Sequence, residues 1–290
     1  MQNKPLITIG MPVYNGGKHI RRALNSILSQ TYRDFELIIS DNASTDETST
    51  ICREYAVNDG RIRYVRQPAN RGAMANFRFV LQEANSKFFM WSAADDIRSP
   101  DFLAANLSFL QSHPEYVAST SPVRFSGGRF DERKMGDASL DDDDRFDRIS
   151  KPFNTSHANG RFYSLFRREA VVTWPHLDDA EFLGSDWTLP THLASLGKLH
   201  RHEDGWVELG IKGMSNRPEL FAFYRKRRIE WLLPYYRVML DAMHHLRKAP
   251  MRKRASLLWK LLRINQYTAR VQYRAHRELR ACAAERKQAP

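Results

Sequence analysis

Cysteine and long apolar runs are both scarce in this sequence, and each absence excludes a class of protein. Cys52 and Cys282 are the two cysteines among 290 residues, too few for a disulfide framework and without the spacing of a zinc site. No stretch is apolar over the length needed to span a bilayer. The opening residues, MQNKPLITIG, lack the layout of a secretory signal. We therefore expect a reducing, cytoplasmic setting.

Acidic residues are scarce in the last part of the chain. Residues 224–290 contain 18 Lys and Arg but 4 Asp and Glu, a net charge of +14. Residues 1–223 contain 27 Lys and Arg and 29 Asp and Glu, a net charge of −2. Such asymmetry indicates separate roles. Because 42% of the residues are hydrophobic, we expect a folded domain over residues 1–223 and a basic helical extension over residues 224–290.

Apolar runs of strand length alternate with segments of helical periodicity. Strands are expected at residues 6–11, 35–40, 62–65 and 88–91, each followed by a turn and a helix. This βαβ rhythm predicts an α/β fold, a mostly parallel sheet with helices on both faces.

Parallel strands joined by right-handed crossovers end at the same edge of a sheet. We therefore expect the loops carrying Tyr14, Asp41, Arg71 and Asp95 to meet there, where open α/β sheets bind ligands.

Several local structures are predicted outside these four strands. Ser44 or Thr45 is expected to cap a helix, and residues 116–125 and 161–166 are each expected to form a strand. The aspartate run at residues 141–144 is interpreted as a solvated loop without chemistry.

Two adjacent carboxylates, Asp95 and Asp96, follow the apolar strand at residues 88–91. Their mutual repulsion favours a cation such as Mg²⁺ or Mn²⁺ between them and a phosphate. The alternative is that they cap the helix expected after Pro100, because Asp is a preferred N-cap residue.

Four segments of this edge resemble the inverting family 2 glycosyltransferases, whose GT-A fold is a Rossmann-like nucleotide-binding sheet. The resemblance covers roughly residues 6–215, and its most characteristic stretch is residues 12–46. The segments are PVYNGGKHIRRALNSILSQTYRDFELIISDNASTD, PANRGAMANF, WSAADDIRSPDFL and GSDWTLPTHLASLGKL.

This resemblance implies a nucleotide-sugar pocket built from four loops, with Pro12, Val13, Tyr14, Asp41, Asn42, Arg71, Asp95 and Asp96. Within it, Asp41 would bond the base, Arg71 would contact the nucleotide and Asp95 would hold a divalent cation, Mn²⁺ or Mg²⁺. Asp186 would be the general base. The sequence departs from the family pattern at Ala93, where an aspartate is usual, and at Ser185, where a glutamate is common before the base.

Most of these residues have a purely structural alternative. Asp41 could end its strand in an Asx turn, Arg71 could be a surface residue, and Tyr14 could be a packing residue. Asp186 could be the N-cap of the helix that follows. Asp178, Asp179 and Glu181 are nearby alternatives for the base.

The resemblance implies an enzyme that moves a sugar from a nucleoside-diphosphate sugar, uridine diphosphate being the expected type, to a glycan or lipid-linked acceptor. Cell-envelope or exopolysaccharide synthesis is the expected setting. The alternatives are a catalytically weak sugar-nucleotide-binding relative and a nucleotidyltransferase. A nucleic-acid-binding protein is a third alternative, suggested by the +14 extension, but it needs aromatic or groove-reading elements joined to the basic face. The carboxylate-lined edge argues against the body in that role, and we expect no nucleic-acid partner.

The basic extension contains two segments near helical spacing, residues 230–246 and 255–264, and Pro234 should interrupt the first. The first is expected to pack on the domain. For the rest, peripheral contact with the inner face of the plasma membrane and plain packing both stay open. The basic loop at residues 212–217 is either a lid over the diphosphate or a connection to the extension.

Overall fold

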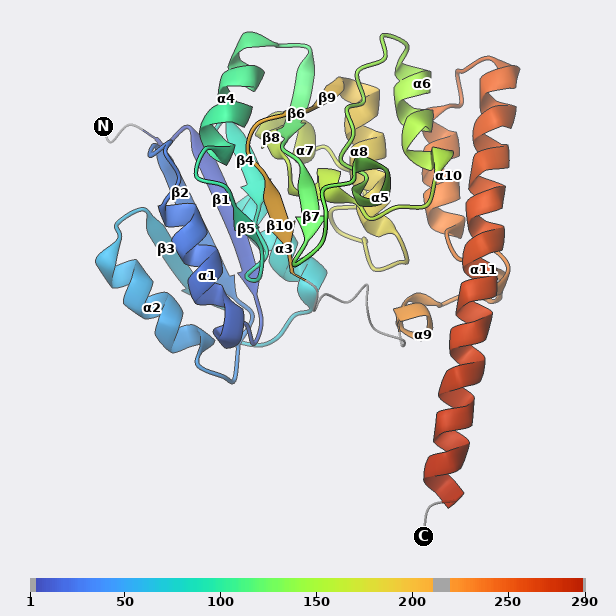
Figure 1. Cartoon of the computed structure of the whole chain (residues 1–290), viewed down its shortest axis with the longest axis horizontal. Coiled ribbons are helices and arrows are strands. Elements are labelled where there is room, and N and C mark those ends of the chain that lie inside the picture. Colours follow the sequence, from blue (N-terminus) through green and yellow to red (C-terminus); the bar gives the residue numbers. More distant parts are fainter. Residues whose placement is uncertain (1–3, 211–219, 289–290) are drawn as a thin grey trace.

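The computed structural model of the chain describes residues 4–210 and 220–288, with side chains up to residue 279. The basic loop at residues 212–217 lies outside the described residues. Figure 1 shows an α/β body with a long helix along one side.

The main sheet, as far as the described residues show, has seven strands in the order β3-β2-β1-β4-β8-β6-β9. Within it β8 alone runs against its neighbours, so the sheet is mostly parallel, as predicted. The strands are β1 (Ile7–Val13), β2 (Phe35–Asp41), β3 (Ile62–Arg66), β4 (Phe88–Trp91), β6 (Tyr116–Thr120), β8 (Leu165–Arg167) and β9 (Lys198–Arg201).

Successive side chains of the central strands enter two different apolar cores. In β4, Phe88 and Met90 belong to one core, while Phe89 and Trp91 belong to the other. Strand residues alternate between faces, so a strand buried on both sides must be apolar throughout. This is why the run FFMW forms a central strand.

Helices cover both faces of the sheet (Figure 1). The first core is closed by α1 (Gly17–Leu28), α2 (Thr48–Asn58) and α4 (Phe102–Ser112). The second is closed by α3 (Ala73–Gln82) and α8 (Ser185–Leu196). Short helices α5 (Glu132–Met135), α6 (Arg145–Ser150) and α7 (Arg168–Val171) lie in the connections.

A second, three-stranded sheet has the order β5-β10-β7. Its strands are β5 (Ile97–Arg98), β7 (Val123–Phe125) and β10 (Val207–Leu209). Because β5 follows Asp96 directly and pairs with β10, this sheet brings the chain near residue 210 to the two adjacent carboxylates.

Three local predictions are correct only in part. Residues 116–125 form two strands in two different sheets, β6 and β7. Residues 160–163 form the 3₁₀ turn η2 (Gly160–Tyr163) before β8. Helix α2 begins later than predicted and has no side-chain cap, because Ser44 instead accepts a hydrogen bond from the backbone N–H of Asn15.

The extension packs on the body through its first part, as predicted for residues 230–246. Val238, Ala242 and Leu246 are buried in the second core. Pro234 separates the turn η4 (Arg228–Trp231) from α10 (Tyr236–His245). The remaining helices are α9 (Leu220–Tyr224) and α11 (Met251–Gln288), and no helix among the described residues is apolar over the length a bilayer requires.

Candidate active site

The loops after β1 and β2 are joined by hydrogen bonds at the carboxyl edge of the sheet. The backbone N–H of Asn15 donates to Ser44 Oγ (2.9 Å), and that of Thr45 donates to Asn15 Oδ1 (2.8 Å). Asn15 and Ala43 both have positive φ, 51° and 60°, which is uncommon for residues with a side chain. Backbone strain of this kind gathers at functional sites.

Asp41 ends β2 and is wholly buried. Its Oδ1 accepts from the backbone N–H of Ser44, and its Oδ2 accepts from the Tyr64 hydroxyl and the Arg66 guanidinium, all at 2.8 Å. Burial, together with Asp41, raises the pKa of Tyr64 to about 12. The Asx-turn geometry is therefore present, and contact between Asp41 and a base stays a prediction.

The Asn42 side chain holds the loop that carries Arg71 through three hydrogen bonds. Its Nδ2 donates to Asn70 Oδ1 (2.9 Å) and to the Gly72 carbonyl (3.0 Å), and its Oδ1 accepts from the backbone N–H of Arg71 (3.0 Å). The Arg71 side chain is exposed. The loops after β2 and β3 thus form one unit, which presents a cation at the edge.

The predicted pocket wall at residues 12–14 divides into buried and exposed parts. Pro12 and Val13 are buried in β1, and the Val13 carbonyl accepts from the backbone N–H of Asn42 (2.8 Å). Tyr14 is 49% exposed. Packing in the core therefore does not explain Tyr14, and its ring is the part of this wall open to a ligand.

Asp95 and Asp96 lie where β4 ends, and they do not cap a helix. Helix α4 begins only at Phe102 with Asp101 at its N-cap, so the capping interpretation is wrong. Asp96 is buried, and its Oδ1 accepts from the backbone N–H of Gly210 (3.1 Å). Burial raises the pKa of Asp96 to about 7, with Arg98 opposing the shift and Asp95 adding to it.

Two features of this pair fit a divalent cation. Asp96 Oδ2 is buried with no hydrogen-bond partner among the described residues, and Asp95 is only half-buried. Within the described ranges, no group of three His, Cys, Asp or Glu forms a site by itself. Mg²⁺ and Mn²⁺ bound with a phosphate need only one or two protein carboxylates, so the pair suffices in number.

Gly210 shapes the position of Asp95. A Cβ atom at Gly210 would lie 1.9 Å from Asp95 Oδ2, so only glycine allows the carboxylate to lie there. Sequence reasoning missed this residue, because its partner is more than a hundred positions earlier in the chain.

Asp186 lies in the first turn of α8, whose N-cap is Gly184. The interpretation of Asp186 as the N-cap is therefore wrong. Its side chain is exposed to solvent, but protein packed around it still desolvates the carboxylate. Burial by that protein raises the pKa of Asp186 to about 6.

The three alternative bases are held by other partners. Asp178 pairs with Arg78 (2.6 Å). Asp179 pairs with His176 and Arg237. Glu181 pairs with Lys226 (3.3 Å). Asp186 has no ion-pair partner among the described residues, and this distinguishes it from the others.

Tyr163 lies near both the Asp95–Asp96 pair and Asp186. The sequence analysis did not identify it. Burial raises its pKa well above the ordinary value of 10, and the charges of Asp96, Asp186 and Asp95 raise it further. The Tyr163 phenol is therefore close enough to all three carboxylates for their charges to act on it, which places the pair after β4 and the acid of α8 in the same region of the molecule. The run RFYSLF around Tyr163 carries no signal of this role.

Two tyrosines of the extension lie near Asp186. The Tyr235 ring occupies the space beside Gly184, where an added Cβ would come within 2.5 Å of it, and it stacks on Trp187 with centroids 5.7 Å apart. Burial raises the pKa of Tyr235 to about 12, with a contribution from Asp186. Burial also raises the pKa of Tyr224, again with Asp186 contributing.

Known proteins are similar to this chain, some in sequence and others in fold. Glycosyltransferase GlyA of Streptococcus pneumoniae is 33% identical over 134 residues, 46% of this chain and 19% of that protein. An uncharacterized glycosyltransferase of Haemophilus influenzae is 35% identical over 112 residues, 38% of this chain and 45% of that protein. The chain spans less than half the length of these relatives.

Among solved structures, S. aureus TarS 1-349 in complex with UDP-GlcNAc has a TM-score of 0.59 at 16% identity, covering 92% of this chain and 91% of that one. Mannosyltransferase PcManGT of Pyrobaculum calidifontis, in complex with GDP-Man and Mn²⁺, has a TM-score of 0.56 at 19% identity, covering 98% and 81%. These likenesses show the fold. Residues 8–173, more than half of the chain, match the profile of Glycosyl transferase family 2, and the chain belongs to this family, with its GT-A fold.

Proposed function

We propose that the chain transfers a sugar from a nucleoside-diphosphate sugar to a hydroxyl group, with inversion at the anomeric carbon. The observation that supports this proposal is that Asp95, Asp96 and Asp186 all lie near Tyr163, close enough for each of their charges to raise its pKa. Asp95 and Asp96 form a pair suited to a cation, and Asp186 is a single carboxylate with a raised pKa. Glycosyl transfer by direct displacement needs both.

The donor half of the site consists of the joined loops after β1, β2 and β3. Tyr14 offers an exposed ring to a base or ribose, and Arg71 offers a cation to the diphosphate. Asp41 and Asn42 hold these loops in place and would form part of the wall of the nucleotide pocket. The sugar nucleotides bound in TarS 1-349 and PcManGT support a nucleotide-sugar donor, and we propose a uridine diphosphate sugar.

Asp95, with Asp96 beside it, would hold a divalent cation, Mn²⁺ or Mg²⁺. Such a cation offsets the negative charge that builds on the departing diphosphate. Support comes from the Asp96 oxygen that lacks a partner and from the Mn²⁺ in the PcManGT complex.

Asp186 is proposed to take the proton of the acceptor hydroxyl as that oxygen attacks. A hydroxyl is a weak nucleophile until a base removes its proton. With a pKa of about 6, the carboxylate is ionised at neutral pH and is still a stronger base than an ordinary aspartate. One displacement without a covalent intermediate inverts the anomeric carbon.

Lowering the pH should inactivate the enzyme near the pKa of Asp186. The base must be deprotonated, so kcat at saturating donor and Mn²⁺ should be constant at neutral pH and fall about tenfold per pH unit below about 6. Donor binding, measured by calorimetry at each pH, separates this effect from a loss of affinity. A profile that stays flat down to the ordinary pKa of an aspartate would contradict the assignment.

Gly210→Ala should weaken cation binding with little loss of stability. The new methyl group would overlap Asp95 Oδ2, and a side-chain end can move away at small cost. We expect Mn²⁺ affinity in the presence of UDP to fall by at least about 10-fold, and Tm to change little. Gly60→Ala is the matched control, because nothing lies within 4 Å of a Cβ there. Equal affinity of the two variants would contradict this role of Gly210.

We propose a glycan or lipid-linked acceptor and a place in cell-envelope or exopolysaccharide synthesis, at the cytoplasmic side of the membrane. We also propose that the chain divides at residue 223 into a transferase domain and a basic extension. The extension helps to surround Asp186 through Tyr224 and Tyr235, so it lies on the acceptor side of the site.

A panel of nucleoside-diphosphate sugars, each with and without Mn²⁺, tests the proposal. The correct donor should raise Tm by mass action and should release a nucleoside diphosphate when an acceptor is present. Ala93 favours a second candidate, a sugar-nucleotide-binding relative with weak catalysis, which predicts stabilisation without turnover. Release of pyrophosphate from a nucleoside triphosphate would indicate a nucleotidyltransferase instead.

A further inference from the structure

Helix α11 buries one face and exposes the opposite one. Leu257, Leu261 and Gln272 are almost completely buried against the rest of the chain. On the opposite face Trp259 is 64% exposed, Tyr273 60% and Leu262 39%. Apolar side chains of this size are costly to leave in water, and several together on one helix face indicate a contact surface.

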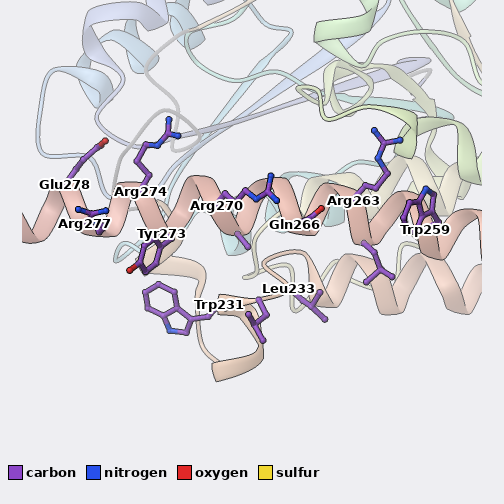
Figure 2. A pocket seen from close by; sticks show the side chains of 13 residues that line it. Trp231, Leu233, Trp259, Arg263, Gln266, Arg270, Tyr273, Arg274, Arg277 and Glu278 are labelled. Carbon is purple, nitrogen blue, oxygen red and sulfur yellow. The ribbon is translucent and has the colours of Figure 1, made fainter.

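The exposed face borders a groove of about 1100 Å³, shown in Figure 2. Its other wall comes from the segment around η4, which contributes Trp231, Leu232 and Leu233. Leu232 is 71% exposed. We use the name outer groove for this surface of α11 and the η4 segment.

The outer groove is also strongly cationic. Its lining includes Arg263, Arg270, Arg274 and Arg277 against the single acid Glu278. All four guanidinium-bearing side chains are exposed, and none of them has an ion-pair partner among the described residues. Helix α11 as a whole contains 11 Lys and Arg against 2 Glu.

We propose that the outer groove binds the surface of a bilayer that contains anionic phospholipid. Trp and Tyr rings settle at the boundary between headgroups and acyl chains, and Leu side chains enter it. Guanidinium groups pair with lipid phosphates, and each cation near an anionic surface adds to the attraction. The outer groove combines these chemistries on one helix face.

The shape of the molecule agrees with this partner. The 38 residues of α11 extend over about 57 Å. The helix stands at one side of the body, and its C-terminal part projects beyond the other elements (Figure 1). A flat surface can therefore contact the helix along its length.

Two other partners fit less well. A second copy of the chain would bring the unpaired arginines of two outer grooves together, and like charges repel. A soluble polyanion would pair with the arginines but would leave exposed aliphatic side chains such as Leu232 and Leu262 without a contact. The inference does not depend on the proposed reaction, because it concerns a surface outside the active site.

Co-sedimentation of the full chain with vesicles tests the proposal. The protein should bind vesicles of phosphatidylcholine mixed with phosphatidylglycerol, should bind pure phosphatidylcholine much more weakly, and should be released progressively by salt. The triple variant Arg263→Glu/Arg270→Glu/Arg277→Glu should bind the mixed vesicles at least about 10-fold more weakly. The triple variant Arg53→Glu/Arg129→Glu/Arg133→Glu has the same charge change at exposed arginines elsewhere and should bind like the wild type.

The apolar part of the surface needs its own variant. Trp259→Ser/Leu262→Ser should weaken binding to mixed vesicles several-fold, whereas Val57→Ser, at an 85% exposed position of α2, should not. Circular dichroism and Tm verify that all variants fold. Because neither assay involves turnover, failure here would leave the proposed transferase reaction unaffected.

Three results would overturn the proposal. Equal binding to pure phosphatidylcholine would exclude recognition of anionic lipid. Equal weakening by both arginine triples would reduce the effect to net charge. Unchanged vesicle binding by Trp259→Ser/Leu262→Ser would indicate a site for a soluble polyanion.

Discussion

Replacing Asp186 by Asn is expected to lower the transfer rate by about 10³-fold while donor binding persists. The amide has nearly the shape of the carboxylate but cannot accept the proton of the acceptor hydroxyl. Asp186 lies among Tyr163, Tyr224 and Tyr235, each of which is influenced by its charge. Neutral Asn relieves the cost of a charge in these surroundings, so the variant should be at least as stable as the wild type.

The measurement compares single-turnover transfer with calorimetric titration of the donor. Asp178→Asn is the matched control, because Asp178 is 77% exposed and pairs with Arg78 at the surface. We expect full activity from it. If Asp178→Asn lost sugar-transfer activity and Asp186→Asn kept it, the general base would be Asp178, in the loop before α8, and not Asp186.

Replacing Asp95 by Ala is expected to abolish the effect of Mn²⁺ on donor binding and to lower transfer by about 10³-fold. The cation contributes several kcal/mol when charge develops on the diphosphate, and Asp95 is its proposed anchor. Asp96 would leave the cation with a single protein oxygen, Oδ2, because its Oδ1 accepts from the backbone N–H of Gly210.

Thermal unfolding with UDP, with and without Mn²⁺, measures this effect. The wild type should gain stability from Mn²⁺ and UDP together beyond that from UDP alone, and the variant should not. Asp204→Ala, at a 78% exposed carboxylate, should behave like the wild type. Persistence of the Mn²⁺ effect in Asp95→Ala would exclude Asp95 as the anchor.

The fold was predictable wherever short-range patterns determine it. Short, mainly apolar runs such as residues 35–40 and 88–91, each bounded by turn residues, are typical of strands buried on both faces, and the parallel order then follows from connection rules. The structure agrees at β2 and β4. Patterns failed where one run serves two sheets, as at residues 116–125, which divide after Thr120.

The part of the candidate site that lies in the loops after β1, β2 and β4 was predictable from sheet topology. Tyr14, Asp41 and Asp95 follow strands directly, so topology alone brings their loops together. The state of Asp41 was not predictable, because its partner Arg66 depends on the register of β2 and β3, which pairs these two residues.

The rest of the site depends on packing between distant segments. Tyr163 and Gly210 acquire their roles only when the second sheet and η2 are in place, and no local pattern in the sequence marks them. Helix α8 was predicted, but its neighbours from the extension were not. Contacts of this kind follow from the complete fold.

The contact between Tyr235 and Gly184 has a consequence for recombining family members. A chimera that joins this transferase domain to the extension of a relative would place a foreign side chain against the glycine that precedes α8. Any larger residue at position 184 would collide with the ring, and any smaller residue at position 235 would open a void beside Asp186. The two positions should therefore be exchanged together, so that the ring beside the start of α8 is kept.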